Sequence, residues 1–206
     1  MQNMNHLILF ARAPVYGRVK QRLAQDIGRQ AALEFYRQTL TALIAQLKPG
    51  PWSLSVSVAT PGDGDHEVFN GLKTTEQPDG DLGVRMKSVL DSYAGCNRII
   101  IGSDIPGIKQ EHVLRAFALL TTSDLVFGPA TDGGFWLVGC SQAQAVFASA
   151  DQLFMSGVRW SGCHALADTL KTLSPDKRVA TAGTLSDVDD LQSYQHYCEA
   201  IAEMSE

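Results

Sequence analysis

Short apolar runs alternate with longer amphipathic stretches along the whole chain. The runs 6–11, 54–60 and 97–103 are apolar, or alternate apolar with small polar residues, as β-strands do. Residues 19–47 carry apolar side chains at helical spacing, with a possible break at Gly28. The pattern therefore predicts strands and helices in alternation.

The rest of the chain continues this alternation. Further strands are expected over 73–77, 123–130, 134–140 and 178–182, and further helices over 78–93, 109–122, 142–147, 164–173 and from about 189 onward. The continuous apolar runs indicate a sheet covered on both faces. We expect a single-domain three-layer α/β/α sandwich with a mostly parallel sheet, spanning residues 1–206. In such a sheet, ligands bind beyond the carboxyl ends of the strands.

Composition narrows the classes of protein. The 206 residues are 45% hydrophobic, which suits one globular domain. A net charge of −5 argues against nucleic acid or an anionic membrane as partner. No stretch approaches the roughly 20 apolar residues of a membrane span. The four cysteines are scattered and form no C-x-x-C pair, so we expect reduced thiols and a cytoplasmic location.

The loop after the first strand is basic. It places Arg12, Arg18, Lys20 and Arg22 around Gly17, just before a predicted helix. A glycine permits close backbone approach, and a helix N-terminus favours an anion, so the loop is a candidate phosphate site. The alternative is that these cations are solvated surface residues. The loop matches no Walker motif, and no G-x-G-x-x-G follows a strand.

Other strand-end loops carry aspartates. Asp104 follows the isoleucine strand, while Asp187 and Asp189 precede the last helix. Each could simply cap a helix. Carboxylates that converge repel one another, however, and a divalent cation would relieve the repulsion. Oxygen ligands of this kind suit Mg²⁺ or Mn²⁺, which also bind substrate phosphates.

The stretch "TDGGFW" offers a third candidate. Gly133 and Gly134 would let backbone approach a ligand, with the Asp132 carboxylate beside it. The alternative is a type I′ hairpin turn. Trp136 could stack on a sugar or a base, although on an alternating strand a tryptophan is more often a core residue.

Six segments together resemble a known family. They are "RAPVYGRVKQRL", "QPDGDLGVRM", "IGSDIPG", "GPATDGGFWLVG", "VRWS" and "DVDDL". The chain resembles bacterial glycosyltransferase-like proteins that are associated with radical-SAM genes and, in some lineages, arsenosugar biosynthesis. That family lies in the nucleotide-diphospho-sugar transferase (GT-A) superfamily, which also contains nucleotidyltransferases. Gln21, Phe135 and Gly162 depart from the family pattern, and Phe135 removes a hydroxyl that could contact an acceptor.

The resemblance implies a role for each matching residue. Arg18, Lys20 and Arg22 look like the phosphate-binding loop. Asp104 looks like the metal-binding aspartate, with Asp187 or Asp189 as its partner. The positions implied to border the nucleotide are Gly80, Asp81 and Arg85. Those expected on the sugar or acceptor side are Asp132, Gly133, Gly134, Trp136 and Trp160.

The leading hypothesis is a metal-dependent transferase that moves a glycosyl group from a nucleotide diphospho-sugar to an unidentified small-molecule acceptor. The metal and the basic loop, Lys20 included, would stabilise the departing diphosphate, and Asp132 would act as base. A nucleotidyltransferase that releases pyrophosphate would present the same loops. A non-catalytic nucleotide-binding protein is the third possibility.

Overall fold

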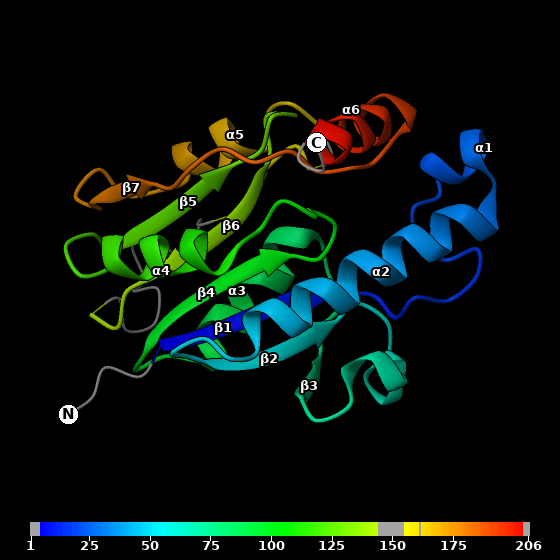
Figure 1. Cartoon of the computed structure of the whole chain (residues 1–206). Helices are drawn as coiled ribbons and strands as arrows, with labels where there is room; N and C mark the ends of the chain where they lie inside the picture. The colour runs from blue at the N-terminus through cyan, green and yellow to red at the C-terminus, as the bar shows by residue number, and fades with distance from the viewer. Residues whose placement is uncertain (1–4, 144–154, 161, 204–206) are drawn as a thin grey trace.

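One seven-stranded sheet organises the molecule, in the order β3-β2-β1-β4-β6-β5-β7 (Figure 1). This computed structural model describes residues 5–143, 155–160 and 162–203. The strands are β1 (Asn5–Ala11), β2 (Ser53–Val58), β3 (Lys73–Glu76), β4 (Asn97–Gly102), β5 (Leu125–Pro129), β6 (Phe135–Cys140) and β7 (Val179–Thr181). Each corresponds to a strand predicted from the sequence, although β3 contains no apolar residue.

The helices connect these strands. They are α1 (Leu23–Ile27), α2 (Arg29–Leu47), α3 (Leu82–Ser92), α4 (Gln110–Leu119), α5 (Ala165–Lys171) and α6 (Leu191–Glu203), with the 3₁₀ turns η1 (Asp63–Asp65) and η2 (Glu67–Phe69). The expected break at Gly28 separates α1 from α2, and its φ of 85° is one that glycine adopts readily. Most of the helix expected over 142–147, and Ser161 of "VRWS", lie outside the described residues.

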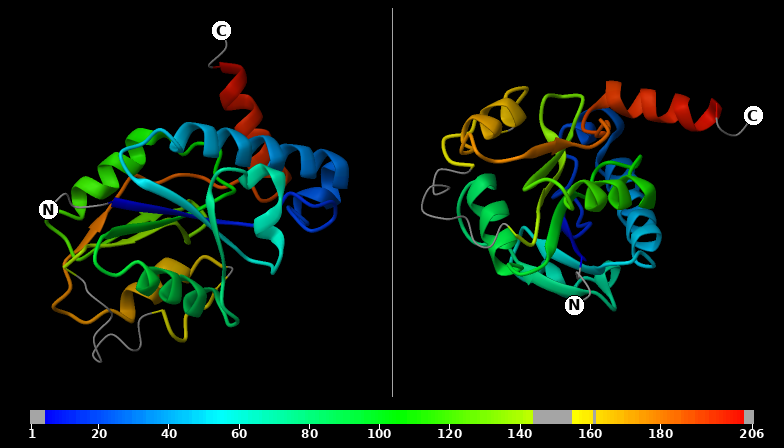
Figure 2. Two further views of the ribbon diagram at one scale, coloured as in Figure 1. Left: turned by 90° about the horizontal axis from the view of Figure 1, so that it is seen from below. Right: turned by 90° about the vertical axis from the view of Figure 1, so that its left-hand side faces the viewer.

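Helices cover both faces of the sheet. Along β1, Leu7 and Leu9 pack with α2 and α4, whereas Ile8 packs on the opposite face with α3 and α5. The two helix layers stand on either side of the sheet in the right-hand view of Figure 2. Since side chains alternate between faces, a strand buried on both sides needs a continuous apolar run. The predicted α/β/α sandwich is confirmed.

Strand direction decides where the loops meet. β6 is antiparallel to β4 and to β5, whereas every other pairing is parallel. All strands except β6 therefore point the same way, and their carboxyl ends share one edge of the sheet. The basic loop, the aspartate-bearing loops and the start of α3 all follow strands at this edge.

The last helix, α6, and the residues before it pack against α1 and α2. Tyr194 and Tyr197 of α6 make edge-to-face contacts with Phe35 of α2, and Val188 is buried with Leu23. Beyond this contact α6 projects away from the sheet (Figure 2). Among the described helices, none is long and apolar enough to cross a membrane.

Candidate functional site

Lys20 joins two aspartates from separate loops. Its Nζ lies 3.2 Å from Oδ2 of Asp104, after β4, and 3.0 Å from Oδ1 of Asp189, after β7. The lysine side chain is only 4% exposed, while the two carboxylates are 38% and 44% exposed. Loops separated by 84 and 169 positions in sequence thus meet at one cation.

Asp104 and Asp189 keep the Lys20 side chain protonated. Burial alone lowers the pKa of its ammonium, but attraction to Asp104 and Asp189, together with hydrogen bonds to both, outweighs burial and raises the pKa overall. Lys20 is therefore an ammonium at neutral pH. Its backbone φ of 46° is in the left-handed region, which is uncommon for a lysine.

Asp187 adds negative charge to the same place. Burial raises its pKa to about 6, helped by the charges of Asp132, Asp104 and Asp189. Each of these charges must lie near Asp187 to act on it. The predicted convergence is therefore seen for Asp104 and Asp189, which share Lys20, and the charges of both act on Asp187.

The remaining cations of the basic loop take different positions. Arg18 Nη2 lies 3.1 Å from Asp63 Oδ1, and Arg22 Nη1 lies 3.5 Å from Asp189 Oδ2. The Arg12 side chain is exposed, and Gly17 has a φ of 73° with open space where a Cβ would point. The loop thus leaves room for an anion at Gly17. α1 has five residues, so its dipole adds little.

Two residues that the sequence did not single out hold this loop. Asp63 is 5% exposed and accepts from Ala13 N at 3.0 Å. The Tyr36 hydroxyl bonds both backbone groups of Arg12 and lies 3.0 Å from Ser103 Oγ, next to Asp104. The "PGDGD" motif indicated only a turn, and nothing in it marked Asp63 as buried.

The capping alternative for the aspartates is wrong. α4 begins at Gln110 with Lys109 before it, so neither Ser103 nor Asp104 caps a helix. At the start of α6 it is Asp190 whose Oδ1 accepts from Ser193 N, at 2.9 Å. The Asp104 and Asp189 carboxylates are left to face Lys20.

The β5–β6 connection is a five-residue loop rather than a two-residue type I′ turn. Asp132 is exposed, and its Oδ1 accepts from Gly134 N at 2.8 Å. A Cβ on Gly133 would lie 2.6 Å from Cys163 Cα, so the glycine is needed for chain packing. The Asp132 carboxylate is thus exposed, and its charge acts on Asp187.

The prediction for Trp136 needs correction. Its side chain is 2% exposed in the core beside α4, and its Nε1 donates to Gly183 O at 2.9 Å. Trp136 has no free face for a sugar, because this strand position points into the apolar layer. Trp160 is half-buried, in an edge contact with Phe135 and above Gly83 at the start of α3.

Gly80, Asp81 and Arg85 shape the start of α3. Asp81 is the N-cap, with Oδ1 accepting from Val84 N at 2.9 Å. Arg85 Nε donates back to Gly80 O, also at 2.9 Å. These bonds show that the three residues form the N-terminal cap of α3. Their expected position beside the nucleotide stays a prediction.

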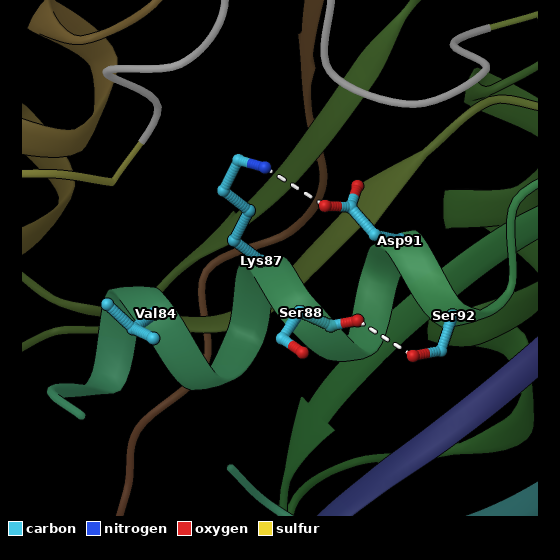
Figure 3. A pocket seen from close by; sticks show the side chains of 5 residues that line it. All are labelled: Val84, Lys87, Ser88, Asp91 and Ser92. Carbon is cyan, nitrogen blue, oxygen red and sulfur yellow. Dashed lines mark hydrogen bonds and ion pairs between the residues drawn. The ribbon is translucent and has the colours of Figure 1, made fainter. Parts of the chain in front are cut away.

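A hollow of about 540 Å³ lies along α3 (Figure 3). Its lining comes from this helix, and in it Lys87 pairs with Asp91 at 2.9 Å while Ser92 Oγ donates to Ser88 O. It contains none of the predicted site residues, so we place the site by the convergence of charges.

The donor set suits a hard divalent cation. Asp104 and Asp189 present carboxylate oxygens that already share one cation, and Mg²⁺ is commonly held by one or two carboxylates plus substrate phosphates. Within the described ranges, no group of three acidic, histidine or cysteine side chains is arranged to hold a metal. The residues thus fit a metal shared with a substrate better than a metal enclosed by protein alone.

Solved structures resemble this one over nearly its full length. The chain matches a "putative nucleotide-diphospho-sugar transferase" from Desulfovibrio desulfuricans G20 with a TM-score of 0.78 and 24% identity, over 94% of this chain and 85% of that one. Glucosyl-3-phosphoglycerate synthase from Mycobacterium tuberculosis, solved with Mn²⁺, UDP and glucosyl-3-phosphoglycerate, gives 0.56 at 13% identity, over 95% and 75%. CMP:2-keto-3-deoxy-manno-octonic acid synthetase complexed with CTP gives 0.59 at 12%, over 98% and 99%.

These likenesses confirm the predicted nucleotide-diphospho-sugar transferase fold. A search of curated proteins finds no match to the sequence. A family model matches residues 40–162, more than half of the chain. The protein therefore belongs to the family described as "Uncharacterized protein conserved in bacteria (DUF2064)".

Proposed function

We propose that the protein is a metal-dependent transferase that moves a glycosyl group from a nucleotide diphospho-sugar to a small-molecule acceptor. One observation carries the proposal: Lys20, Asp104 and Asp189 come from three loops and meet at the carboxyl edge of the sheet. Such an edge is where open α/β sheets bind ligands. A buried ammonium next to exposed carboxylates suits a site for a diphosphate and a metal.

The residues divide the work of the reaction. Lys20, Arg18 and Arg22 would bind the diphosphate and stabilise the charge that grows on it as the glycosyl bond breaks. Asp104 and Asp189 would hold Mg²⁺ or Mn²⁺, which when bound supplies further positive charge beside the same oxygens. Asp132 is exposed, and its carboxylate would take the proton from the acceptor hydroxyl.

The comparisons support this choice. The structure with the TM-score of 0.78 carries the name of a nucleotide-diphospho-sugar transferase. The mycobacterial synthase was solved with Mn²⁺ and UDP, and a further similar structure, Rv0371c, with manganese.

Nucleotidyl transfer is the second candidate. It is favoured by the similarity to a synthetase that binds CTP, because that reaction also places charge on phosphate oxygens beside a metal. The two candidates differ in what leaves the donor. Glycosyl transfer releases a nucleoside diphosphate, and nucleotidyl transfer releases pyrophosphate.

A ligand screen followed by product detection tests the proposal. Nucleotide sugars and nucleoside triphosphates are incubated with the protein, Mn²⁺ and a panel of small-molecule alcohols and phosphorylated acceptors, with binding followed by thermal shift and products by mass spectrometry. We expect Asp104→Asn to lose metal-dependent nucleotide binding, and Asp26→Asn, an exposed acid on α1, to keep it. Unchanged binding by Asp104→Asn would show that the metal site is misplaced.

Two finer predictions rest on sequence features. The radical-SAM and arsenosugar association rests on the six family segments, and the cytoplasmic location rests on the spacing of the cysteines. Products of the screen would test the first, since an acceptor of unrelated chemistry would argue against it.

A further inference from the structure

Lys20 occupies the carboxylate pair that is proposed to bind the metal. We propose that Lys20 is a tethered cation that holds the Asp104–Asp189 pair until a diphosphate draws its ammonium away, so that a divalent metal and a nucleoside diphosphate bind synergistically. This inference rests on the proposed function and adds a coupling between its two ligands. It predicts that metal alone binds weakly.

The competition follows from the geometry. Lys20 Nζ lies 3.2 Å from Asp104 Oδ2 and 3.0 Å from Asp189 Oδ1, so it is in hydrogen-bond contact with one oxygen of each carboxylate. A metal bound between those oxygens would stand about 2.1 Å from them, in the space and on the lone pairs that the ammonium uses. Two cations in that space would also repel. Lys20 must therefore withdraw before a metal can bind between these two oxygens.

The surroundings allow this withdrawal. The partner carboxylates are 38% and 44% exposed, so water can solvate them when Lys20 leaves. The lysine stem is flexible, and its ammonium carries three donors that suit phosphate oxygens. Lys20 also lies between Gly17, whose neighbourhood is open, and Arg22. A diphosphate bound along this loop would attract the ammonium toward itself and uncover the acidic pair.

A purely structural role for Lys20 predicts the reverse. If its ammonium serves to hold the two loops together, then removing it separates Asp104 from Asp189 and weakens metal binding. The two roles thus differ in the sign of one measured quantity, the affinity of the protein for Mn²⁺ without nucleotide.

The experiment measures Mn²⁺ binding by the electron paramagnetic resonance signal of free Mn²⁺. Lys20→Met keeps the apolar stem and removes the charge, and Lys20→Arg keeps the charge. Arg29→Met removes a positive charge from an exposed side chain at the start of α2, outside the basic loop and the acidic pair. We expect Lys20→Met to bind Mn²⁺ about tenfold more tightly than wild type, Lys20→Arg to remain weak, and Arg29→Met to change much less.

The second arm adds UDP, CDP, GDP or ADP, with nucleotide-bound Mn²⁺ in protein-free controls subtracted. We expect a nucleoside diphosphate to increase Mn²⁺ affinity in wild type and to increase it by a smaller factor in Lys20→Met, where the diphosphate can share the metal but no longer has an ammonium to displace. If wild type binds Mn²⁺ measurably and Lys20→Met binds it equally or more weakly, the tethered cation is overturned and the proposed metal site is not. No Mn²⁺ binding by any variant, with or without diphosphate, would overturn the proposed metal site as well.

Discussion

Asp63 is paired with Arg18 across 45 positions of sequence, at 3.1 Å, and the same carboxylate accepts from Ala13 N through its other oxygen. The aspartate is almost completely buried, whereas the Arg18 side chain is 44% exposed. The buried Asp63 carboxylate on η1 thus holds the basic loop through two hydrogen bonds, while the Arg18 guanidinium remains accessible to solvent. Asp63 is a positioning residue for the proposed diphosphate site.

Asp63→Asn should therefore destabilise the protein. Ala13 N and Arg18 donate to different oxygens of Asp63, and in asparagine one of these oxygens becomes an NH₂ group that cannot accept. The expected loss in free energy of unfolding is about 1–3 kcal/mol. Urea denaturation measures it. Asp65→Asn, on the same 3₁₀ turn but exposed, should stay within about 0.5 kcal/mol of wild type. Equal effects of the two substitutions would contradict the positioning role.

Tyr36→Phe removes the hydroxyl that links the basic loop to the end of β4. The hydroxyl bonds Arg12 N, Arg12 O and Ser103 Oγ, and the residue is 4% exposed. These groups would lose a buried partner, so we expect a loss of about 1–3 kcal/mol in the free energy of unfolding. Tyr16→Phe is the control, since Tyr16 is in the same loop and is 57% exposed. Comparable losses would show that the Tyr36 hydroxyl has no special role.

His6 should make stability depend on pH. Burial, and then the charge of Lys73, lower the pKa of this imidazole to about 4 in the folded protein, from 6.5 when unfolded. Between these values the unfolded chain binds the proton more readily, so His6 lowers stability as pH falls from 6.5 to 4 and has no effect above 6.5. The shift corresponds to about 3 kcal/mol, which screening at this half-buried site reduces to about 1–2.

The difference between wild type and His6→Gln isolates this effect. Chemical denaturation from pH 7.5 to 4 should show the wild type losing more stability than the variant, because glutamine does not titrate. His196→Gln, on the exposed surface of α6, should follow wild type. Parallel curves for His6→Gln and wild type would contradict the assignment.

The sequence predicted the strands and helices of the fold better than it predicted the side-chain contacts of the site. The sequence predicted every described strand, most of them from apolar runs although β3 has none, and Gly28 marked the end of α1 because a φ of 85° favours glycine. The meeting of the loops followed from the parallel sheet. The sequence did not predict which side chains contact one another. The motif "PGDGD" contains both Asp63 and Asp65, and only the tertiary structure shows that Asp63 is the buried one.

Alternation along a strand has the same limit. It shows that Trp136 and its neighbour face opposite sides, but which side holds the core depends on the helices packed there, and Trp136 faces α4. Lys20 is comparable, since a lysine in a basic loop normally extends into water. Its two aspartates come from loops far away in sequence, so no local pattern indicates that it turns inward.

Gly133→Ala tests whether "DGG" is required by the fold or by a ligand. The φ of Gly133 is 88°, and an added Cβ would lie 2.6 Å from Cys163 Cα, with backbone rather than a movable side chain in the way. A left-handed alanine and this clash should together cost at least about 1–3 kcal/mol in free energy of unfolding. Gly183→Ala, at a glycine with open space around it, should change stability by less than about 0.5 kcal/mol. Thermal and urea unfolding of both variants give the comparison. Should Gly133→Ala fold with wild-type stability yet lose ligand binding, the glycine would belong to the ligand site rather than to the contact with residue 163.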